Sequence, residues 1–309
     1  MKTLIAGTYT SDHASKGIYT FTFDEGKLSQ PRLFTEIKSP KYTAADDGHI
    51  ASIGEFENGA GAALISPEGE ILSTIGYEQR TSCYIAFHED RIYTANYHEG
   101  TVSVLDYSDG ALKLINKVEI RDGAGCHQVL FHDDMVLVPC LFLDRVAMFD
   151  KDLNYKGSLR FEAGTGPRHG VFTKDGKTFY LVSELSNELF RFNTEDGSLT
   201  GRVSVLPDGR THIRDTAAIR LSDDEKNVYV STRTVDLISV IDAETMEWKQ
   251  SVYSGGRHPR DFILLDGYLL CANRYSNSVV CFKLKEDGTI GKETGMINVP
   301  SAVSLTVID

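Results

Sequence analysis

The chain has 309 residues, of which 41% are hydrophobic and 25% charged, and its formal net charge at pH 7 is −12. This acidic balance disfavours nucleic acid and anionic membranes as partners, because both require clustered lysine or arginine. No apolar run approaches membrane-spanning length, and no low-complexity segment marks a linker. We therefore expect one domain over residues 1–309.

The N-terminal residues become polar at Thr8, which is too early for the apolar stretch of a secretory signal. The five cysteines are odd in number and lack CxxC spacing, so they indicate neither a disulfide framework nor a zinc site. We expect a reducing, cytoplasmic location. The sequence leaves open whether the protein is a monomer or a homodimer.

Taken in chain order, the predicted elements are strands, because apolar and polar residues alternate with a period of two. Residues 2–10 form the first strand. Copies of a pattern of four strands joined by short polar turns follow it, the first of them weaker than the rest. These copies cover residues 41–75, 83–120, 126–161, 168–205, 217–253 and 260–293.

The end of each second strand makes the period explicit. The residues at these ends are 41 to 49 positions apart, which is the period of a four-stranded propeller blade. They are Tyr9, Glu55, Tyr97, Leu141, Glu184, Arg233 and Arg274.

The two ends of the chain predict how the ring closes. The first copy begins with a second strand and lacks a first strand, whereas residues 301–308 read as an innermost strand with no successors. Pairing of the two would complete the seventh blade and remove an open edge. We therefore predict an all-β fold, a seven-bladed β-propeller with four-stranded blades, in which the C-terminal strand pairs with the N-terminal strand.

In such a blade the first strand runs away from one face and the second runs back to it. Starts of first strands and ends of second strands therefore meet at one mouth of the central channel. The chain concentrates cationic and titratable residues at these positions, which suits a small anionic ligand. The candidates are Glu55, Tyr97, His127, Arg168, His169, Glu184, Arg214, Arg233, His258, Arg260 and Arg274.

Several of these segments carry a resemblance to a known family. They are Cys126-His127-Gln128, Gly166-Pro167-Arg168-His169, Ser183-Glu184-Leu185-Ser186, residues 217–222 with 228–233, and residues 256–262. As an ordered set, together with Gly7-Thr8-Tyr9-Thr10, they resemble the lactonase family of seven-bladed propellers. That family includes propeller-type 6-phosphogluconolactonase and carboxymuconate-lactonizing enzyme.

The resemblance implies hydrolysis of a sugar lactone, 6-phosphogluconolactone to 6-phosphogluconate. Such a reaction needs a base for water, positive charge for the oxyanion and a clamp for phosphate. The hypothesis assigns Glu184 or His169 as the base, with His127 as the alternative, and Arg168 and Arg233 as oxyanion stabilisers. Arg260, His258 and Arg274 would hold the phosphate, with Arg214, Tyr97 and Glu55 as further substrate contacts.

Two other readings stay open. The same mouth could hold a muconate-like dicarboxylate in a lactonizing cyclase, or bind a metabolite or protein without catalysis. No HxH or HExxH spacing is present, so we expect no metal and no other cofactor.

Overall fold

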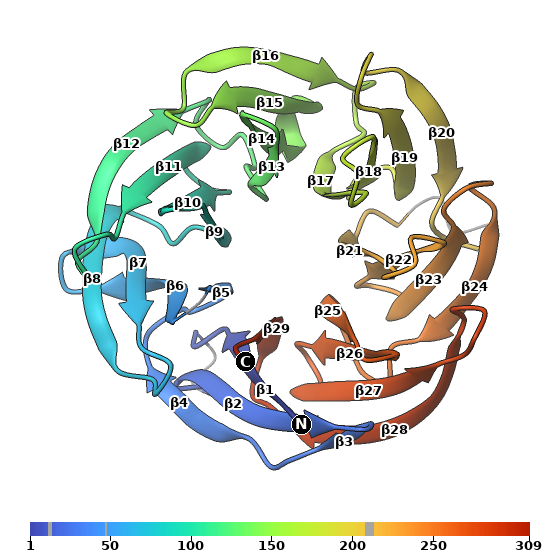
Figure 1. Ribbon diagram of the computed structural model, residues 1–309, viewed down its shortest axis with the longest axis horizontal. Coiled ribbons are helices and arrows are strands. Elements are labelled where there is room, and N and C mark those ends of the chain that lie inside the picture. Colours follow the sequence, from blue (N-terminus) through green and yellow to red (C-terminus); the bar gives the residue numbers. More distant parts are fainter. Residues whose placement is uncertain (12–13, 47, 208–212) are drawn as a thin grey trace.

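The computed structural model describes residues 1–11, 14–46, 48–207 and 213–309. These residues form seven antiparallel sheets that stand as blades around a central axis (Figure 1). The blade that holds both chain ends consists of β1 (Lys2–Thr8), β2 (Gly17–Asp24), β3 (Lys27–Leu28), β4 (Arg32–Glu36) and β29 (Ala302–Val307). The seven-bladed, all-β prediction is confirmed.

Each of the other six blades has four strands, numbered in chain order from the axis outward. The first three of these blades are β5 (Thr43–Asp46), β6 (His49–Phe56), β7 (Gly59–Ile65) and β8 (Ile71–Glu78); β9 (Tyr84–His88), β10 (Arg91–Asn96), β11 (Thr101–Asp106) and β12 (Lys113–Glu119); and β13 (Leu130–His132), β14 (Met135–Cys140), β15 (Arg145–Asp150) and β16 (Tyr155–Arg160). The last three are β17 (Pro167–Phe172), β18 (Thr178–Ser183), β19 (Glu188–Asn193) and β20 (Leu199–Ser204); β21 (Thr216–Leu221), β22 (Asn227–Thr232), β23 (Leu237–Asp242) and β24 (Trp248–Tyr253); and β25 (Pro259–Leu265), β26 (Tyr268–Asn273), β27 (Ser278–Leu284) and β28 (Ile290–Asn298). A single 3₁₀ turn, Leu141–Leu143, interrupts this pattern among the described residues.

The hydrophobic core is divided among the joints between blades. The buried side chains of the described residues form seven clusters, and each cluster joins the middle strands of two neighbouring blades. In one such cluster Val102 and Val104 of β11 pack with Val136 and Val138 of β14. Because every joint has its own apolar cluster, the ring is held at all seven joints rather than by one central core.

The predicted closure is also confirmed. Strand β29 pairs antiparallel with β1, with Leu4 opposite Val307 and Ala6 opposite Leu305. The Asp309 carboxylate accepts hydrogen bonds from the Thr3 backbone N–H at 2.8 and 2.9 Å. Both chain ends therefore lie in one blade, as Figure 1 shows.

Five of the loops between second and third strands are four residues long and end in a left-handed residue. These end residues are Gly100, Asp144, Asn187, Asp236 and Asn277, with φ between 47° and 64°. Glycine, asparagine and aspartate tolerate this conformation best. Four of them also use their side chains to bind the loop that enters the next blade, as in the 2.8 Å bond from the Ser301 N–H to the Asn277 side chain.

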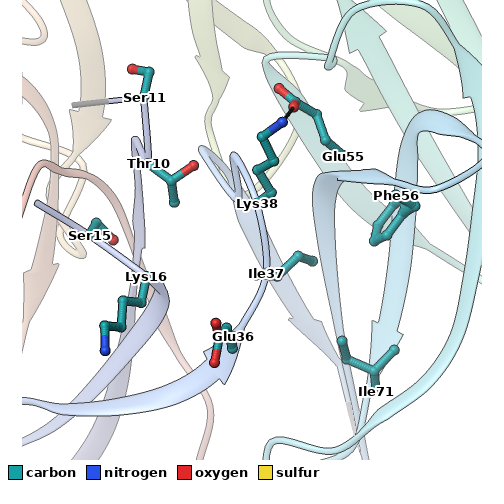
Figure 2. Close-up of a pocket in the computed structure, with 10 residues that line it drawn as sticks. All are labelled: Thr10, Ser11, Ser15, Lys16, Glu36, Ile37, Lys38, Glu55, Phe56 and Ile71. Atoms are coloured by element: carbon teal, nitrogen blue, oxygen red, sulfur yellow. Dashed lines mark ion pairs between the residues drawn. The ribbon is translucent and has the colours of Figure 1, made fainter. Parts of the chain in front are cut away.

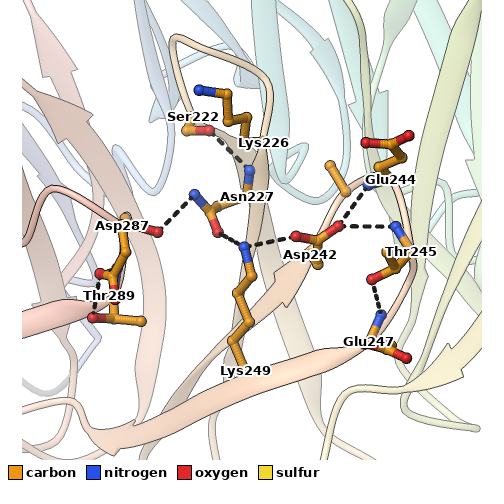
Figure 3. A network of polar contacts seen from close by, with 12 residues as sticks. Ser222, Lys226, Asn227, Asp242, Glu244, Thr245, Glu247, Lys249, Asp287 and Thr289 are labelled. Atoms are coloured by element: carbon orange, nitrogen blue, oxygen red, sulfur yellow. Dashed lines mark hydrogen bonds and ion pairs between the residues drawn. The ribbon is translucent and has the colours of Figure 1, made fainter.

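The opposite face carries polar contacts that also join blades. Figure 3 shows one such network, in which the Lys249 ammonium donates to the side chains of Asn227 (2.8 Å) and Asp242 (2.7 Å). Asn227 in turn donates to the Asp287 carbonyl of the next blade at 3.3 Å. Among the residues described, no helix has the length and apolar character that a membrane span requires.

Candidate active site at the mouth of the channel

The predicted positional series is reproduced in the blades. In six of the seven, the residue singled out from the sequence directly follows the second strand, so its side chain starts from an equivalent place at the mouth. Glu55 departs from this pattern and lies within β6, opposite Ala60. Strands β6 and β7 are joined by a tight turn at Glu57 and Asn58, so β6 extends past the point where the other second strands end.

An alternating chain of charges forms one half of the mouth. The Arg168 Nε donates to one Glu184 oxygen at 2.8 Å, and Arg233 pairs with the other at 3.0 Å. Arg233 also pairs with Asp215. Arg168 donates further to the Ala217 carbonyl at 2.6 Å and is only 1% exposed. Two arginines therefore fix both oxygens of one carboxylate.

The pairing controls the ionisation of Glu184. Burial raises the pKa of this carboxyl, but the charges of Arg168 and Arg233 outweigh burial and hold its pKa below the ordinary 4.5. Burial and the neighbouring Arg233 charge lower the pKa of Arg168 to about 10. At neutral pH the carboxylate is therefore ionised and oriented.

Two histidines lie close enough to this chain of charges for Arg168 to act on both. The His127 Nδ1 and His169 Nε2 atoms are 3.0 Å apart, and both rings are almost completely buried. Burial, assisted by the Arg168 charge, holds the pKa of both well below 6.5, so both are neutral at pH 7. The buried Nδ1 of His169 has no hydrogen-bond partner among the described residues.

The other half of the mouth surrounds Tyr9, the residue that follows β1. The guanidinium carbon of Arg274 lies 3.8 Å from the centre of the Tyr9 ring, and that of Arg260 lies 5.5 Å away. The Lys41 ammonium approaches to 5.8 Å. None of these three cations forms an ion pair with a carboxylate in the part of the chain that the structure describes. This half of the mouth therefore carries positive charge that the described side chains leave unpaired.

Two further predicted residues lie at the same mouth. The Tyr97 ring meets the His127 ring edge-to-face, with centroids 5.8 Å apart. His258 has a left-handed backbone with φ 66° and packs against Tyr275 at 4.3 Å. Burial, together with the charges of Arg233, Arg260 and Arg274, lowers the pKa of His258 to about 3.

In the described part of the chain, Glu55 and Arg214 form no hydrogen bond or ion pair with the arginines and histidines of the mouth. Figure 2 shows Glu55 in a groove between the blade that holds both chain ends and the β5–β8 blade, where it pairs with Lys38 at 2.8 Å; Ile37 and Phe56 also line this groove. Lys38, more than the partial burial of the carboxyl, holds the pKa of Glu55 below 4.5. Arg214 is exposed. Their predicted substrate contacts stay predictions.

Sequence reasoning did not assign a role to three residues of the mouth: Tyr9, Lys41 and Asp215. The position of Tyr9 in the periodic series was a usable signal, because it matches Glu184 and Arg274 blade for blade. Lys41 belongs to the weakest copy of the repeat, and no motif marks it. Among the residues that the structure describes, no group of three or more His, Cys, Asp or Glu side chains is arranged to hold a metal ion.

Comparison with known proteins agrees with this architecture. The family model described as "Lactonase, 7-bladed beta-propeller" matches residues 3–307. The chain belongs to this lactonase family. The resemblance inferred from the mouth segments is thereby confirmed over nearly the full length.

Three individual proteins are similar to the chain over nearly its whole length. The 6-phosphogluconolactonase of Bacillus subtilis is 29% identical over 337 aligned positions, covering 97% of this chain and 94% of the relative. A crystal structure from Lactobacillus plantarum is 27% identical, with a TM-score of 0.89 over 100% of this chain and 99% of the other. The periplasmic gluconolactonase PpgL of Pseudomonas aeruginosa, 22% identical, shares the fold with a TM-score of 0.89, covering 100% and 99% of the two chains.

Proposed function

We propose that the protein hydrolyses a sugar lactone and that its substrate is 6-phosphogluconolactone. The observation that carries the proposal is the division of the mouth into two halves. One half holds an ionised, doubly clamped carboxylate, and the other holds cations without carboxylate partners. The first half suits the attack of water on a carbonyl, and the second suits a phosphate.

The charge balance supports an anionic substrate. Five cations meet at the mouth, and two carboxylates contact them, Glu184 and Asp215, which leaves an excess of three positive charges. A phosphate dianion would compensate most of that excess. The 6-phosphogluconolactonase of Bacillus subtilis, related over almost the whole chain, supports the same choice.

In this proposal Glu184 is the general base. Glu184 keeps a fixed orientation and is ionised at neutral pH, whereas the two histidines are almost completely buried and their pKa values are well below 6.5. Arg168 positions Glu184, since its Nε and one of its terminal nitrogens donate to Glu184 and the Ala217 carbonyl. Arg233 stabilises the oxyanion, and Arg260, Arg274 and His258 hold the phosphate. His169 and His127 are the alternative bases.

The reaction needs no metal or other cofactor in this proposal, so chelation should leave the rate unchanged. The five cysteines are free, and the thiols of Cys126 and Cys140 share a hydrogen bond at 3.9 Å and form no disulfide. Free thiols support the proposed cytoplasmic location. The proposed partner is the small anionic substrate alone, taken up by a monomer or a homodimer.

The test is turnover of freshly prepared 6-phosphogluconolactone, with spontaneous hydrolysis subtracted. Glu184→Gln should lower kcat by about 10²- to 10⁴-fold, because it removes the base while keeping the side-chain shape. Glu188→Gln is the matched control, since Glu188 pairs with Arg202 on the outside of the same blade. It should retain the wild-type rate.

Other outcomes separate the competing readings. Consumption of a muconate in place of the lactone would identify a cyclase. Calorimetric binding of 6-phosphogluconate without turnover of either compound would identify a binding protein. If Glu184→Gln keeps full activity while His127→Asn or His169→Asn loses it, the base is a histidine.

A further inference from the structure

The phenol of Tyr9 is a proton-carrying group at the mouth to which the proposed mechanism assigns no role. Tyr9 follows β1 as Glu184 follows β18, so both residues occupy the same position in their blades. Its backbone is fixed by the bond from its N–H to the Ser301 carbonyl at 3.2 Å, next to the pairing of β1 with β29. The side chain is half-buried. Tyr9 is therefore held at the mouth by the same strand pairing that closes the ring.

The charged groups that face Tyr9 come from three other parts of the chain. Arg260 lies on β25, Arg274 follows β26, and Lys41 precedes β5. The Cys83 thiol also faces it, from the segment before β9. The Arg274 guanidinium covers the ring itself, and its buried Nε has no hydrogen-bond partner among the described residues. Positive charge thus surrounds the phenol.

This environment separates Tyr9 from the other tyrosines. Burial raises the pKa of Tyr9, but the charges of Arg260, Lys41 and Arg274 outweigh burial and hold it below the ordinary 10. Eight tyrosines have the opposite shift, with burial as the first cause: Tyr42, Tyr77, Tyr84, Tyr93, Tyr97, Tyr107, Tyr180 and Tyr229. Tyr9 therefore releases its proton more readily than these eight tyrosines do.

Opening a lactone requires an acid as well as a base. The ring oxygen leaves as an alkoxide unless it receives a proton as the carbon–oxygen bond breaks. In the resting enzyme Glu184 is ionised and both histidines are neutral, so the one acidic proton that these three groups could supply is the proton that Glu184 takes from water. Burial raises the pKa of the Cys83 thiol and weakens it as an acid.

We propose that Tyr9 is the general acid that protonates the departing ring oxygen; the proposal rests on the lactonase function proposed above. Water attacks the carbonyl carbon and gives one proton to Glu184. The tetrahedral intermediate collapses, the bond from the carbonyl carbon to the ring oxygen breaks with its electron pair on oxygen, and the Tyr9 hydroxyl supplies the proton. Arg260, Arg274 and Lys41 stabilise the phenolate, which recovers a proton from the new carboxylic acid, and Glu184 releases to solvent the proton that it took from water. The balance is one lactone and one water to one hydroxy carboxylate and one proton.

Tyr9→Phe tests the proposal because it removes the hydroxyl and keeps the ring that Arg274 covers. The full chain is assayed with 6-phosphogluconolactone across pH. We expect kcat to fall by about 10²- to 10³-fold with KM changed less than about threefold. The wild-type rate should fall as pH rises and Tyr9 ionises, and the variant should lack this alkaline limb. Lys41→Met should move the limb to higher pH, because it removes one charge that favours the phenolate.

A spectroscopic titration gives a readout independent of turnover. The ultraviolet absorbance of phenolate should show one tyrosine that ionises early in the wild type and is missing in Tyr9→Phe. Tyr155→Phe removes an exposed phenol on β16 and should preserve both the early titration and the rate.

The outcomes are distinguishable. A wild type that hydrolyses the lactone alongside an equally active Tyr9→Phe overturns the acid role alone. A wild type without an early-ionising tyrosine also overturns it. A wild type that is inactive toward lactones overturns both this role and the proposed function.

Discussion

The pKa values of two partly or fully buried carboxyl groups are shifted in opposite directions, because their surroundings differ. Glu78 is 5% exposed, and burial raises its pKa to about 6, although the Ser82 hydroxyl, 2.9 Å from both carboxylate oxygens, donates a shared hydrogen bond to them. Glu99 is also partly buried, yet Lys117 and the N–H groups of Gln79 and Arg80 overcome burial and lower its pKa. Hydrogen bonds to a charged partner therefore decide whether the pKa of a buried carboxyl group is raised or lowered.

Glu78→Gln should therefore stabilise the protein at neutral pH. The folded state favours the protonated carboxyl, so the stability from Glu78 is fully present below pH 4.5 and is lost as pH rises through 6. A shift of this size corresponds to about 2 kcal/mol. Urea unfolding at pH 4.5 and pH 7 should show the gain at pH 7 only.

Glu99→Gln is the control with the opposite sign. The pKa of Glu99 is lowered in the folded protein, so the stability that Glu99 contributes is present at neutral pH and is lost as the pH falls. The variant should be less stable than the wild type at pH 7. Equal effects of the two substitutions at pH 7 would contradict this account.

At the scale of the element, the four-residue loops explain how distant blades keep a common geometry. The left-handed residue at the end of each loop lets the chain enter the third strand, and in four blades its side chain also binds the next blade's entry loop. Asn187 makes the most contacts, since its oxygen accepts bonds from the N–H of Asp215 and Thr216 and from the Thr216 hydroxyl. Loop conformation and blade docking therefore depend on the same residue.

Asn187→Ala should cost about 3 kcal/mol, because it strains a left-handed position and leaves buried donors unpaired. Asn187→Gly should cost less, since glycine relieves the strain but not the lost bonds. Asn277→Ala should also cost less, because the Asn277 oxygen accepts one such bond. Urea denaturation midpoints measure the order, and Asn277→Ala as the most harmful of the three would refute it.

Much of the arrangement of strands and loops could be predicted from the sequence. Period-two alternation and polar turns located the blades, and the positional series placed Tyr97, Glu184, Arg233 and Arg274 at equivalent points. Glu55 does not occupy the equivalent position, because a tight hairpin between β6 and β7 extends β6 past it. The sequence of this weak repeat does not show where the strand ends. The pairing of Glu184 with two arginines could not be predicted from the sequence either. Arg233 belongs to the neighbouring blade, and the direction of its side chain depends on how the two blades pack.

For the whole molecule, the decisive feature is that the seventh blade is assembled from both ends of the chain. Deleting residues 301–309 would leave the inner edge of β1 unpaired and remove Ala302 and Leu305 from the joint that they share with Leu270 and Ala272. An unpaired edge above an opened apolar joint favours aggregation. We expect the shortened chain to be aggregated, or far less stable, in light scattering and thermal unfolding.

A permuted chain provides the control. Residues 301–309 can be moved ahead of Met1 through a short turn, because Asp309 already contacts Lys2 and Thr3. The seventh blade would then follow the chain order of the other six. This permutant should recover the stability that the deletion loses, and a deletion that unfolds like the wild type would disprove the role of closure.

Six side chains start from equivalent places around one opening, because each directly follows the second strand of its blade. This arrangement affects how substitutions could change the site. Leu141 is fully buried, whereas the other five side chains belong to the proposed binding site, and the apolar joints that hold the ring lie elsewhere in the blades. Substitutions at these five positions should therefore change the ligand preference of the mouth while the joints between blades stay intact. A small combinatorial library at Tyr9, Tyr97, Glu184, Arg233 and Arg274 would test this directly.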